Sequence, residues 1–214
     1  MPLVLVVRHG HVAGNAEHRF IGQTDVPLDD LGRSQASALS ERLGRLPITR
    51  IISSDLARAV DTVRPTAERL GLPIATDARL REIHNGEWSG LLPNEIAEAW
   101  PEMWASYVGG ADVRRPGGET WEEVRRRAVE VIEEQENVEG TVVLCTHGGP
   151  TLNLARWATG IPAGGNVFRG TLAAVANTSL TAIELPGPRL VIFNDSGHLA
   201  EPALDVHYPF EPVT

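Results

Sequence analysis

Two runs of consecutive aliphatic residues are the strongest hydrophobic signals in the chain. The first covers Leu3 to Val7 and is followed by Arg8-His9-Gly10, and the second covers Thr141 to Cys145 and is followed by Thr146-His147-Gly148. Continuous apolar runs that are rich in β-branched residues are typical of strands buried on both faces. We therefore expect two central strands in a sheet that helices cover on both sides.

Between and after these runs, apolar residues recur at spacings of three and four, which predicts amphipathic helices. The first pattern starts behind the candidate N-caps Asp29 and Asp30 and stops at Pro47, and the second ends at Gly71. The predicted helices cover about 31–46, 56–70, 121–131 and 151–159. Shorter strands are expected at 50–53 and 72–75, and at 180–185 and 190–193.

The last two of these strands flank Pro186-Gly187-Pro188, which predicts a hairpin or two adjacent edge strands. We expect this region to be either a dimer edge, giving a homodimer, or the end of the sheet.

The alternation of strands and helices predicts an α/β fold, a three-layer α/β/α sandwich with a mainly parallel sheet. The irregular interval 85–119 contains three tryptophans and several prolines and glycines, and it is expected to be a helical insertion over the active-site edge of a single domain, 1–214. In such sheets ligands bind beyond the carboxyl ends of the strands. Any site is therefore expected at the end where the two aliphatic strands stop.

Composition narrows the class of protein. The 214 residues carry a formal net charge of −9 and include one cysteine, Cys145. The acidic balance and the missing basic run argue against nucleic acid as a partner. No leader or long apolar span is visible, so we expect a cytoplasmic protein without a membrane partner. Two Asn-x-Ser triplets, at Asn177 and Asn194, would matter only as glycosylation sites in a secreted protein, and we set them aside.

Basic side chains are expected to converge at the carboxyl ends of the strands. Arg8 and His9 follow one aliphatic strand, His147 follows the other, and Arg58 is expected about one turn into the helix after the 50–53 strand. A guanidinium group can donate to two phosphate oxygens at once, and backbone N–H groups at helix starts are further donors. The predicted ligand is therefore phosphate or carboxylate. Neither a Walker lysine loop nor a Gly-x-Gly-x-x-Gly fingerprint occurs.

The order of the motifs resembles the histidine phosphatase superfamily, in its phosphoglycerate mutase-like branch. The matching residues run in family order from about Leu3 to His198: Arg8-His9-Gly10, Asn15, Asp25-x-Pro27-Leu28, Gly32, Ser53-Ser54-Asp55-Leu56-x-Arg58-Ala59, Glu82, Gly86-x-Trp88-x-Gly90, Gly117-Gly118-Glu119 and His147-Gly148. The segment from Leu80 to Gly90 is especially similar to broad-specificity and α-ribazole phosphatases.

The resemblance implies that His9 attacks phosphorus and forms a phosphohistidine, which water then hydrolyses. Arg8, Arg58 and His147 would hold the equatorial phosphate oxygens. Glu82 would protonate the leaving alkoxide and later activate water. The remaining implied phosphate contacts are Asn15, Gly22, Gln23 and Gly148.

Several alternatives stay open at this point. A 2,3-bisphosphoglycerate-dependent phosphoglycerate mutase is the first. Resemblance to such mutases would imply a longer insertion between Glu82 and Glu119, and the 36 residues that separate them here favour a phosphatase. A non-catalytic phosphate-binding module is the second.

We expect no metal and no cofactor, because two guanidinium groups would repel a dication. A cysteine hydrolase built on Cys145 is less favoured than a buried thiol. The other histidines, His11, His18, His84, His198 and His207, are expected on the surface or behind the site.

Overall fold

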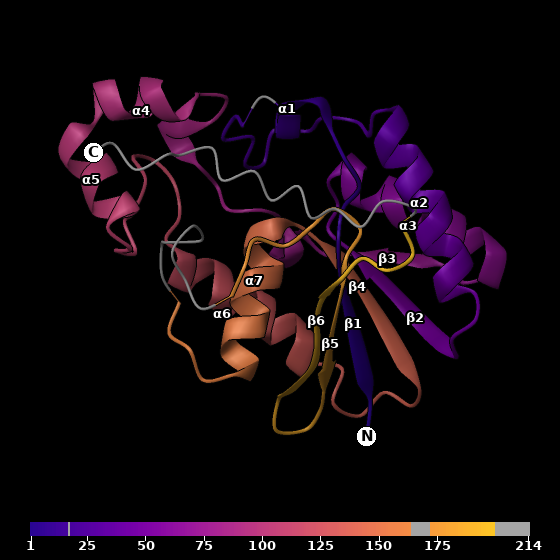
Figure 1. The fold of residues 1–214 in the computed structure, drawn as a ribbon. Helices are drawn as coiled ribbons and strands as arrows, with labels where there is room; N and C mark the ends of the chain where they lie inside the picture. Colours follow the sequence, from indigo (N-terminus) through magenta and orange to yellow (C-terminus); the bar gives the residue numbers. More distant parts are fainter. Residues whose placement is uncertain (17, 164–171, 200–214) are drawn as a thin grey trace.

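The sheet of this protein has six strands in the order β3-β2-β4-β1-β5-β6 (Figure 1). The computed structural model describes residues 1–16, 18–163 and 172–199. The strands are β1 (Leu3–Arg8), β2 (Ile48–Ser53), β3 (Ile74–Thr76), β4 (Thr141–Thr146), β5 (Leu180–Glu184) and β6 (Arg189–Asp195). The two aliphatic runs are β1 and β4, and they pair side by side in parallel, with Arg8 opposite Thr146. The expectation of two central strands is confirmed.

The first four strands are parallel, whereas β5 and β6 are antiparallel to their neighbours. Strands β5 and β6 form the expected hairpin. The alternative of two edge strands is wrong for β5, which pairs with β1 on one side and β6 on the other. The physical reason is burial, since residues 180–183 are all buried while most of β6 is partly or fully exposed.

Helices cover both faces of the sheet, which confirms the three-layer α/β/α sandwich. The helix pair α2 (Asp30–Leu43) and α3 (Ala57–Leu70) lies on one side, and α6 (Trp121–Glu133) and α7 (Gly148–Ala158) lie on the other (Figure 1). Helix α2 starts where the Asp29 carboxylate accepts a hydrogen bond from the N–H of Gly32. It ends at Gly44, earlier than predicted, and Leu46 beyond it is exposed.

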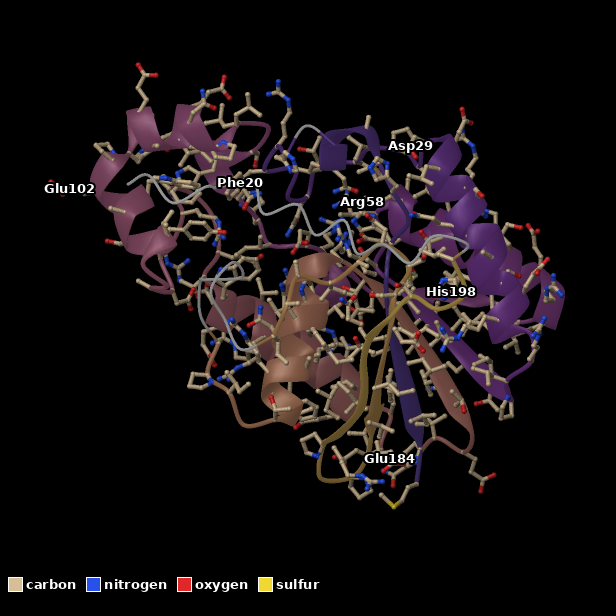
Figure 2. The ribbon with its side chains drawn as sticks, viewed as in Figure 1. Phe20, Asp29, Arg58, Glu102, Glu184 and His198 are labelled. Carbon is tan, nitrogen blue, oxygen red and sulfur yellow. The ribbon has the colours of Figure 1, made fainter. Side chains whose placement is uncertain are left out.

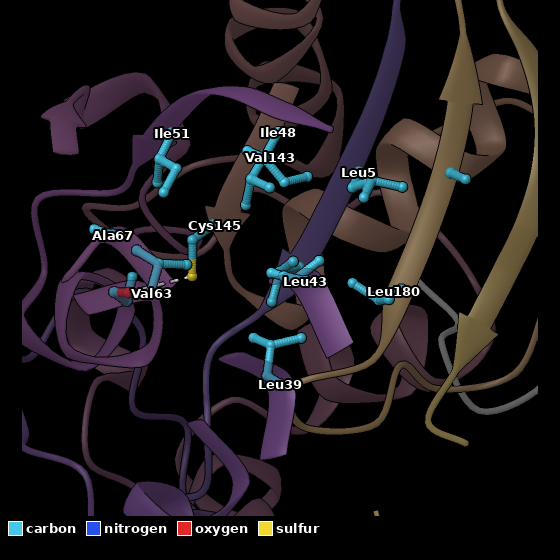
Figure 3. Close-up of a cluster of buried hydrophobic side chains, with 13 residues drawn as sticks. Leu5, Leu39, Leu43, Ile48, Ile51, Val63, Ala67, Val143, Cys145 and Leu180 are labelled. Atoms are coloured by element: carbon cyan, nitrogen blue, oxygen red, sulfur yellow. Dashed lines mark hydrogen bonds between the residues drawn. The ribbon is translucent and has the colours of Figure 1, made fainter. Parts of the chain in front are cut away.

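The alternating residues of β1 and β4 separate the core into two layers. Leu5, Val7, Val143 and Cys145 face α2 and α3, where they pack with the other residues drawn in Figure 3. Their neighbours in sequence face α6 and α7 on the other side. A strand exposes successive side chains to opposite faces, so a run buried throughout must lie between two helical layers.

The interval 85–119 has a small core of its own. It contains a 3₁₀ turn, η2 (Gly86–Trp88), and the helices α4 (Pro93–Ala99) and α5 (Pro101–Val108), which lie toward the carboxyl end of the strands in Figure 1. Trp88, Ile96 and Tyr107 are buried there, and Trp100 and Trp104 pack around them. The short elements α1 (Ala13–Ala16) and η1 (Ala78–Leu80) complete the described chain. None of its described helices is long and apolar enough to cross a bilayer.

Candidate active site

The predicted basic residues meet at the carboxyl ends of β1, β2 and β4. His9 and His147 each directly follow a strand, and their ring centroids lie 5.1 Å apart. Figure 2 shows Arg58 at this end of the sheet, far from Glu184 at the opposite end. Arg58 is the second residue of α3, so it lies earlier than the expected position about one turn into the helix. Leu56 is the N-cap and makes no side-chain cap, yet α3 begins within one residue of the predicted start at 56.

The ring of His9 is buried and held in one tautomer. Its Nδ1 lies 2.7 Å from the carbonyl oxygen of Gly10. A carbonyl oxygen only accepts hydrogen bonds, so Nδ1 carries the proton and Nε2 keeps its lone pair. Burial, followed by the positive charges of Arg8 and Arg58, holds the pKa of His9 well below its ordinary value. The imidazole is therefore neutral at physiological pH, as a nucleophile must be.

His147 is fully buried and is also neutral. Its Nδ1 accepts a hydrogen bond of 3.2 Å from Nε of Arg58, and its Nε2 lies 2.9 Å from Oγ of Ser54. Because the guanidinium only donates, the ring proton must be on Nε2. Burial and the charge of Arg58 hold the pKa of His147 well below its ordinary value. The one N–H of the ring therefore donates to Oγ of Ser54, and the ring carries no full charge.

Both arginines are desolvated. Arg58 donates 2.7 Å hydrogen bonds to the carbonyl oxygens of Thr24 and Gly22, so its guanidinium is tied to the loop before α2. Gly22 has a φ of +54°, a conformation that glycine adopts with little cost. Arg8 donates from Nη1 to the carbonyl oxygen of Val175. Burial lowers the pKa of Arg8 to about 10, and the nearby Glu82 partly opposes this.

Nε of Arg8 is buried, and no described residue accepts a hydrogen bond from it. A buried donor of this kind needs a partner such as a ligand oxygen. Gly148 begins α7 next to it: a Cβ placed on Gly148 would lie 3.6 Å from Nε of Arg8. The first turn of α7 and the guanidinium therefore border the same space.

The carboxylate of Glu82 lies at the N-terminus of α7. Its two oxygens accept hydrogen bonds from the N–H of Ile83 at 2.9 Å and of Gly149 at 3.1 Å. This approach requires glycine, because a Cβ at Gly149 would lie 2.3 Å from Oε1 of Glu82 and 2.5 Å from Trp121. Gln23 donates from Nε2 to the carbonyl oxygen of Glu82 at 3.0 Å. Its predicted role in binding phosphate stays a prediction.

Arg127 holds the segment that carries Glu82. Its guanidinium donates to the carbonyl oxygens of Arg79, Arg81 and Glu82 and forms two hydrogen bonds with the carboxylate of Glu119. Burial alone would raise the pKa of Glu119, but the bonds and charge of Arg127 outweigh it and keep the pKa below its ordinary value. Glu119 therefore stays ionised and paired.

The remaining candidates lie around this centre. Oδ1 of Asn15 accepts a hydrogen bond from the N–H of Val12 at 3.2 Å and one from Nδ2 of Asn177 at 3.5 Å. Nδ1 of His11 lies 2.6 Å from the carboxylate of Asp29, at the start of α2. The outer histidines fall into three groups: exposed His18 and His84, half-buried His198 near Thr178, and His207, which lies outside the described residues.

Cys145 takes no part in this centre. Its side chain is fully buried in β4 against α3, with Sγ 3.2 Å from the carbonyl oxygen of Ala59. Burial raises the pKa of the thiol, so the reactive thiolate is disfavoured. Over the described ranges, no group of three or more histidine, cysteine or acidic side chains is arranged to hold a metal ion.

Sequence reasoning missed four residues that contact either the central side chains or the main chain that carries them. Ser54 contacts His147, Gly149 contacts Glu82, Arg127 supports the Glu82 segment and Asn177 donates to the His9 carbonyl. Ser54 belongs to a motif that carries the resemblance and Gly149 directly follows another, so their position was a usable signal. Arg127 is 45 residues from Glu82 and Asn177 is 168 residues from His9, and no local pattern links them to these partners.

Comparisons with known proteins agree with this geometry. The model of the histidine phosphatase superfamily (branch 1) matches residues 4–195. A glucosyl-3-phosphoglycerate phosphatase from Mycobacterium tuberculosis is 31% identical, over 94% of this chain and 98% of its own length. Phosphoglycerate mutase-like protein 4 from Arabidopsis thaliana is 33% identical, over 92% and 87%. The structure of a mycobacterial glucosyl-3-phosphoglycerate phosphatase with VO3 superposes with a TM-score of 0.80, at 33% identity and over 91% and 99%.

Proposed function

The chain belongs to the histidine phosphatase superfamily, and we propose that it is a metal-independent phosphomonoester hydrolase that works through a phosphohistidine on His9. The observation that carries this proposal is the buried, neutral His9, whose Nε2 lone pair is free while Arg8, Arg58 and His147 surround it. Such a centre combines a nucleophile with donors for the equatorial phosphate oxygens.

In the first step, Nε2 of His9 attacks phosphorus and the bond between phosphorus and the ester oxygen breaks. The leaving alkoxide takes a proton from Glu82. Arg8, Arg58 and His147 stabilise the charge on the three equatorial oxygens, with Asn15 as a further donor. The main-chain N–H groups at Gly148 and Gly22 border the phosphate, and Gln23 is retained as an additional contact.

In the second step, water attacks the phosphohistidine and the bond between nitrogen and phosphorus breaks. Glu82, now ionised, accepts the proton of the water, and inorganic phosphate leaves. Nδ1 of His9 keeps its proton throughout because it donates to the carbonyl oxygen of Gly10. The proton of Glu82 leaves with the alcohol and is replaced by one from water, so each side chain regains its starting protonation state and no cofactor is required.

The substrate is proposed to be a small phosphorylated metabolite. Relatives with this family's fold are named for glucosyl-3-phosphoglycerate and for phosphoglycerate. These two compounds are therefore the first to test. The mutase name of the plant relative favours one second candidate, a phosphoglycerate mutase that needs a bisphosphorylated primer.

The test is hydrolysis of p-nitrophenyl phosphate by the wild type, His9→Ala and the control His84→Ala, each with and without EDTA. His84 is exposed, so its replacement leaves the buried centre intact. We expect EDTA to have no effect and His9→Ala to lose at least about 1,000-fold in kcat, as removal of a nucleophile does in other covalent enzymes. Hydrolysis that survives in His9→Ala would overturn the nucleophile assignment.

The same proteins are then assayed for mutase activity on 3-phosphoglycerate, primed with 2,3-bisphosphoglycerate. Activity only in this assay would establish the mutase instead. Vanadate binding without turnover in either assay would indicate a phosphate-binding module.

Two further expectations remain proposals. We place the protein in the cytoplasm, on the basis of its single buried cysteine. We also retain the homodimer, because the edge strand β6 exposes Val191 and Ile192. Light scattering at micromolar concentration measures the mass, and a monomer would remove the second proposal.

A further inference from the structure

The two Asn-x-Ser triplets that the sequence left without a role both lie close to the end of β1. Asn177-Thr178-Ser179 immediately precedes β5, and Asn194 is near the end of β6. Thr178 and Asn194 adopt positive φ values of +55° and +56°, and Thr178 is completely buried. A β-branched residue in this conformation is a genuine outlier, and such outliers cluster at functional sites.

The first triplet binds the main chain of the two residues proposed to react with and hold phosphate. The N–H of Thr178 donates to the carbonyl oxygen of Arg8 at 2.9 Å. Nδ2 of Asn177 donates to the carbonyl oxygen of His9 at 2.8 Å. On the other side, the N–H of His9 donates to the carbonyl oxygen of Thr146 at 2.9 Å. The peptide units around His9 are therefore fixed from both neighbouring strands.

Asn194 fixes the segment just before this triplet with both ends of its amide. Oδ1 accepts a hydrogen bond from the N–H of Ala176 at 2.7 Å, and Nδ2 donates to the carbonyl oxygen of Ala174 at 3.1 Å. Between these two residues lies Val175, whose carbonyl oxygen accepts from the Arg8 guanidinium. Only a side chain with one donor and one acceptor in this geometry, such as an amide, makes both bonds.

We propose that Asn177 and Asn194 are positioning residues: Asn177 fixes the main chain of His9, and Asn194 fixes Val175 and, through it, the guanidinium of Arg8. This inference rests on the proposed nucleophilic role of His9. Asn177 then acts on the attacking nitrogen and Asn194 on a phosphate-binding group. Substitutions of Asn177 and of Asn194 are therefore expected to change different kinetic parameters.

The experiment measures kcat and KM for p-nitrophenyl phosphate, inhibition by inorganic phosphate, and thermal unfolding. Asn177→Asp keeps the size of the side chain but replaces the donor with an acceptor. Asn194→Gly keeps the left-handed backbone but removes the amide. Asn137→Ala, at an exposed position before β4, is the matched control.

We expect Asn177→Ala and Asn177→Asp to lower kcat by about 10- to 50-fold with KM within 3-fold, since small displacements of a reacting group cost up to about 100-fold. Asn194→Gly is expected to raise KM and the inhibition constant of phosphate by about 10-fold, because a reoriented guanidinium forms weaker bidentate contacts. Asn137→Ala should match the wild type. Because Asn177→Asp is isosteric, it remains a test if Asn177→Ala fails to fold.

A fall in melting temperature with wild-type kcat and KM in all Asn177 and Asn194 variants would overturn the inference, because that pattern is purely structural. Loss of kcat in Asn177→Ala together with wild-type kcat in Asn177→Asp would also overturn it, since side-chain size and not hydrogen bonding would then matter. If His9→Ala keeps hydrolysis, the proposed function fails. If His9→Ala is inactive while the asparagine variants turn over normally, only the positioning role fails.

Discussion

The segment that carries His9 and the segment that carries Glu82 are held by different kinds of hydrogen bond. Around His9 the partners are main-chain groups and neutral side chains: Thr146, Asn177, Thr178 and the hydroxyl of Thr62, which accepts from the N–H of Gly10. Around Glu82 the principal partner is the charged guanidinium of Arg127.

This difference matters because neutral and charged hydrogen bonds respond differently to change. A hydrogen bond between neutral groups contributes about 0.5–1.5 kcal/mol and one to a charged group about 1.5–3 kcal/mol. The nucleophile thus depends on many small contributions from strands on both sides. The acid depends on one arginine and on the close approach of α7. We therefore expect single substitutions among the residues that hold Glu82 to lower kcat more than those among the residues that hold His9.

Among substitutions of the residues that hold His9 and Glu82 in place, Gly149→Ala has the largest expected effect. Its Cβ would lie 2.3 Å from Oε1 of Glu82 and 2.5 Å from the packed ring of Trp121, so the carboxylate must move. We expect kcat for an alkyl phosphate to fall by about 100-fold. The adjacent Gly148→Ala, whose Cβ meets its nearest atom at 3.6 Å, should lose only a few-fold. Steady-state kinetics of both variants would contradict this interpretation if the losses were equal.

Arg127→Met is expected to have the next largest effect. It removes three hydrogen bonds to carbonyl oxygens and leaves the half-buried Glu119 without its partner, at a cost of about 2 kcal/mol in the free energy of unfolding. We expect a loss of about 10-fold in kcat for alkyl phosphates and less for aryl phosphates, because poor leaving groups need the acid most. Urea unfolding measures the change in the free energy of unfolding, and steady-state kinetics measure kcat for the two kinds of ester.

The exposed neighbour Arg126→Met is the matched control for this substitution, and Glu82→Gln is the reference for a lost acid. Equal losses of kcat for aryl and alkyl esters in Arg127→Met would contradict the inference that Arg127 supports the acid role of Glu82.

The smallest expected effect is on the pH dependence of the free energy of unfolding, which differs between the segment of His9 and the segment of Glu82. The pKa values of His9 and His147 are lowered by burial and by nearby arginines, so the unfolded chain binds these protons more readily than the folded one. Their contribution to stability is present above about pH 6.5 and falls below it, by at most about 1.4 kcal/mol per pH unit for each histidine.

Glu119, whose pKa is also lowered, keeps its contribution down to about pH 4.5 and loses it as the pH falls through the folded value. Urea unfolding between pH 7.5 and 5 should therefore show a smaller slope in His9→Gln than in the wild type and an unchanged slope in Glu119→Gln. A wild-type slope in His9→Gln would contradict the buried neutral state of His9.

Much of the sheet and the centre could be predicted because burial on both faces leaves a readable pattern. Strands β1 and β4 are continuous aliphatic runs, and the residues that follow them must meet at one edge. Ends of helices were less accurate where no side-chain cap marks them, as at His147, where α7 begins at Gly148 and not at the predicted residue 151. Arg127 could not be singled out from its neighbours Arg125 and Arg126, because its partners come from another part of the chain.

Strand β1 lies between β4 and β5, and this placement determines the order in which the molecule can be completed during synthesis. The residue that we propose to react follows β1 directly, yet its flanking strands begin much later in the chain, at Thr141 and Leu180. Pairings so distant in sequence form slowly, since a long loop must close first. A ribosome must therefore translate β4 and β5 before His9 acquires its neighbours, and a nascent chain that stops before β5 holds an incomplete catalytic centre.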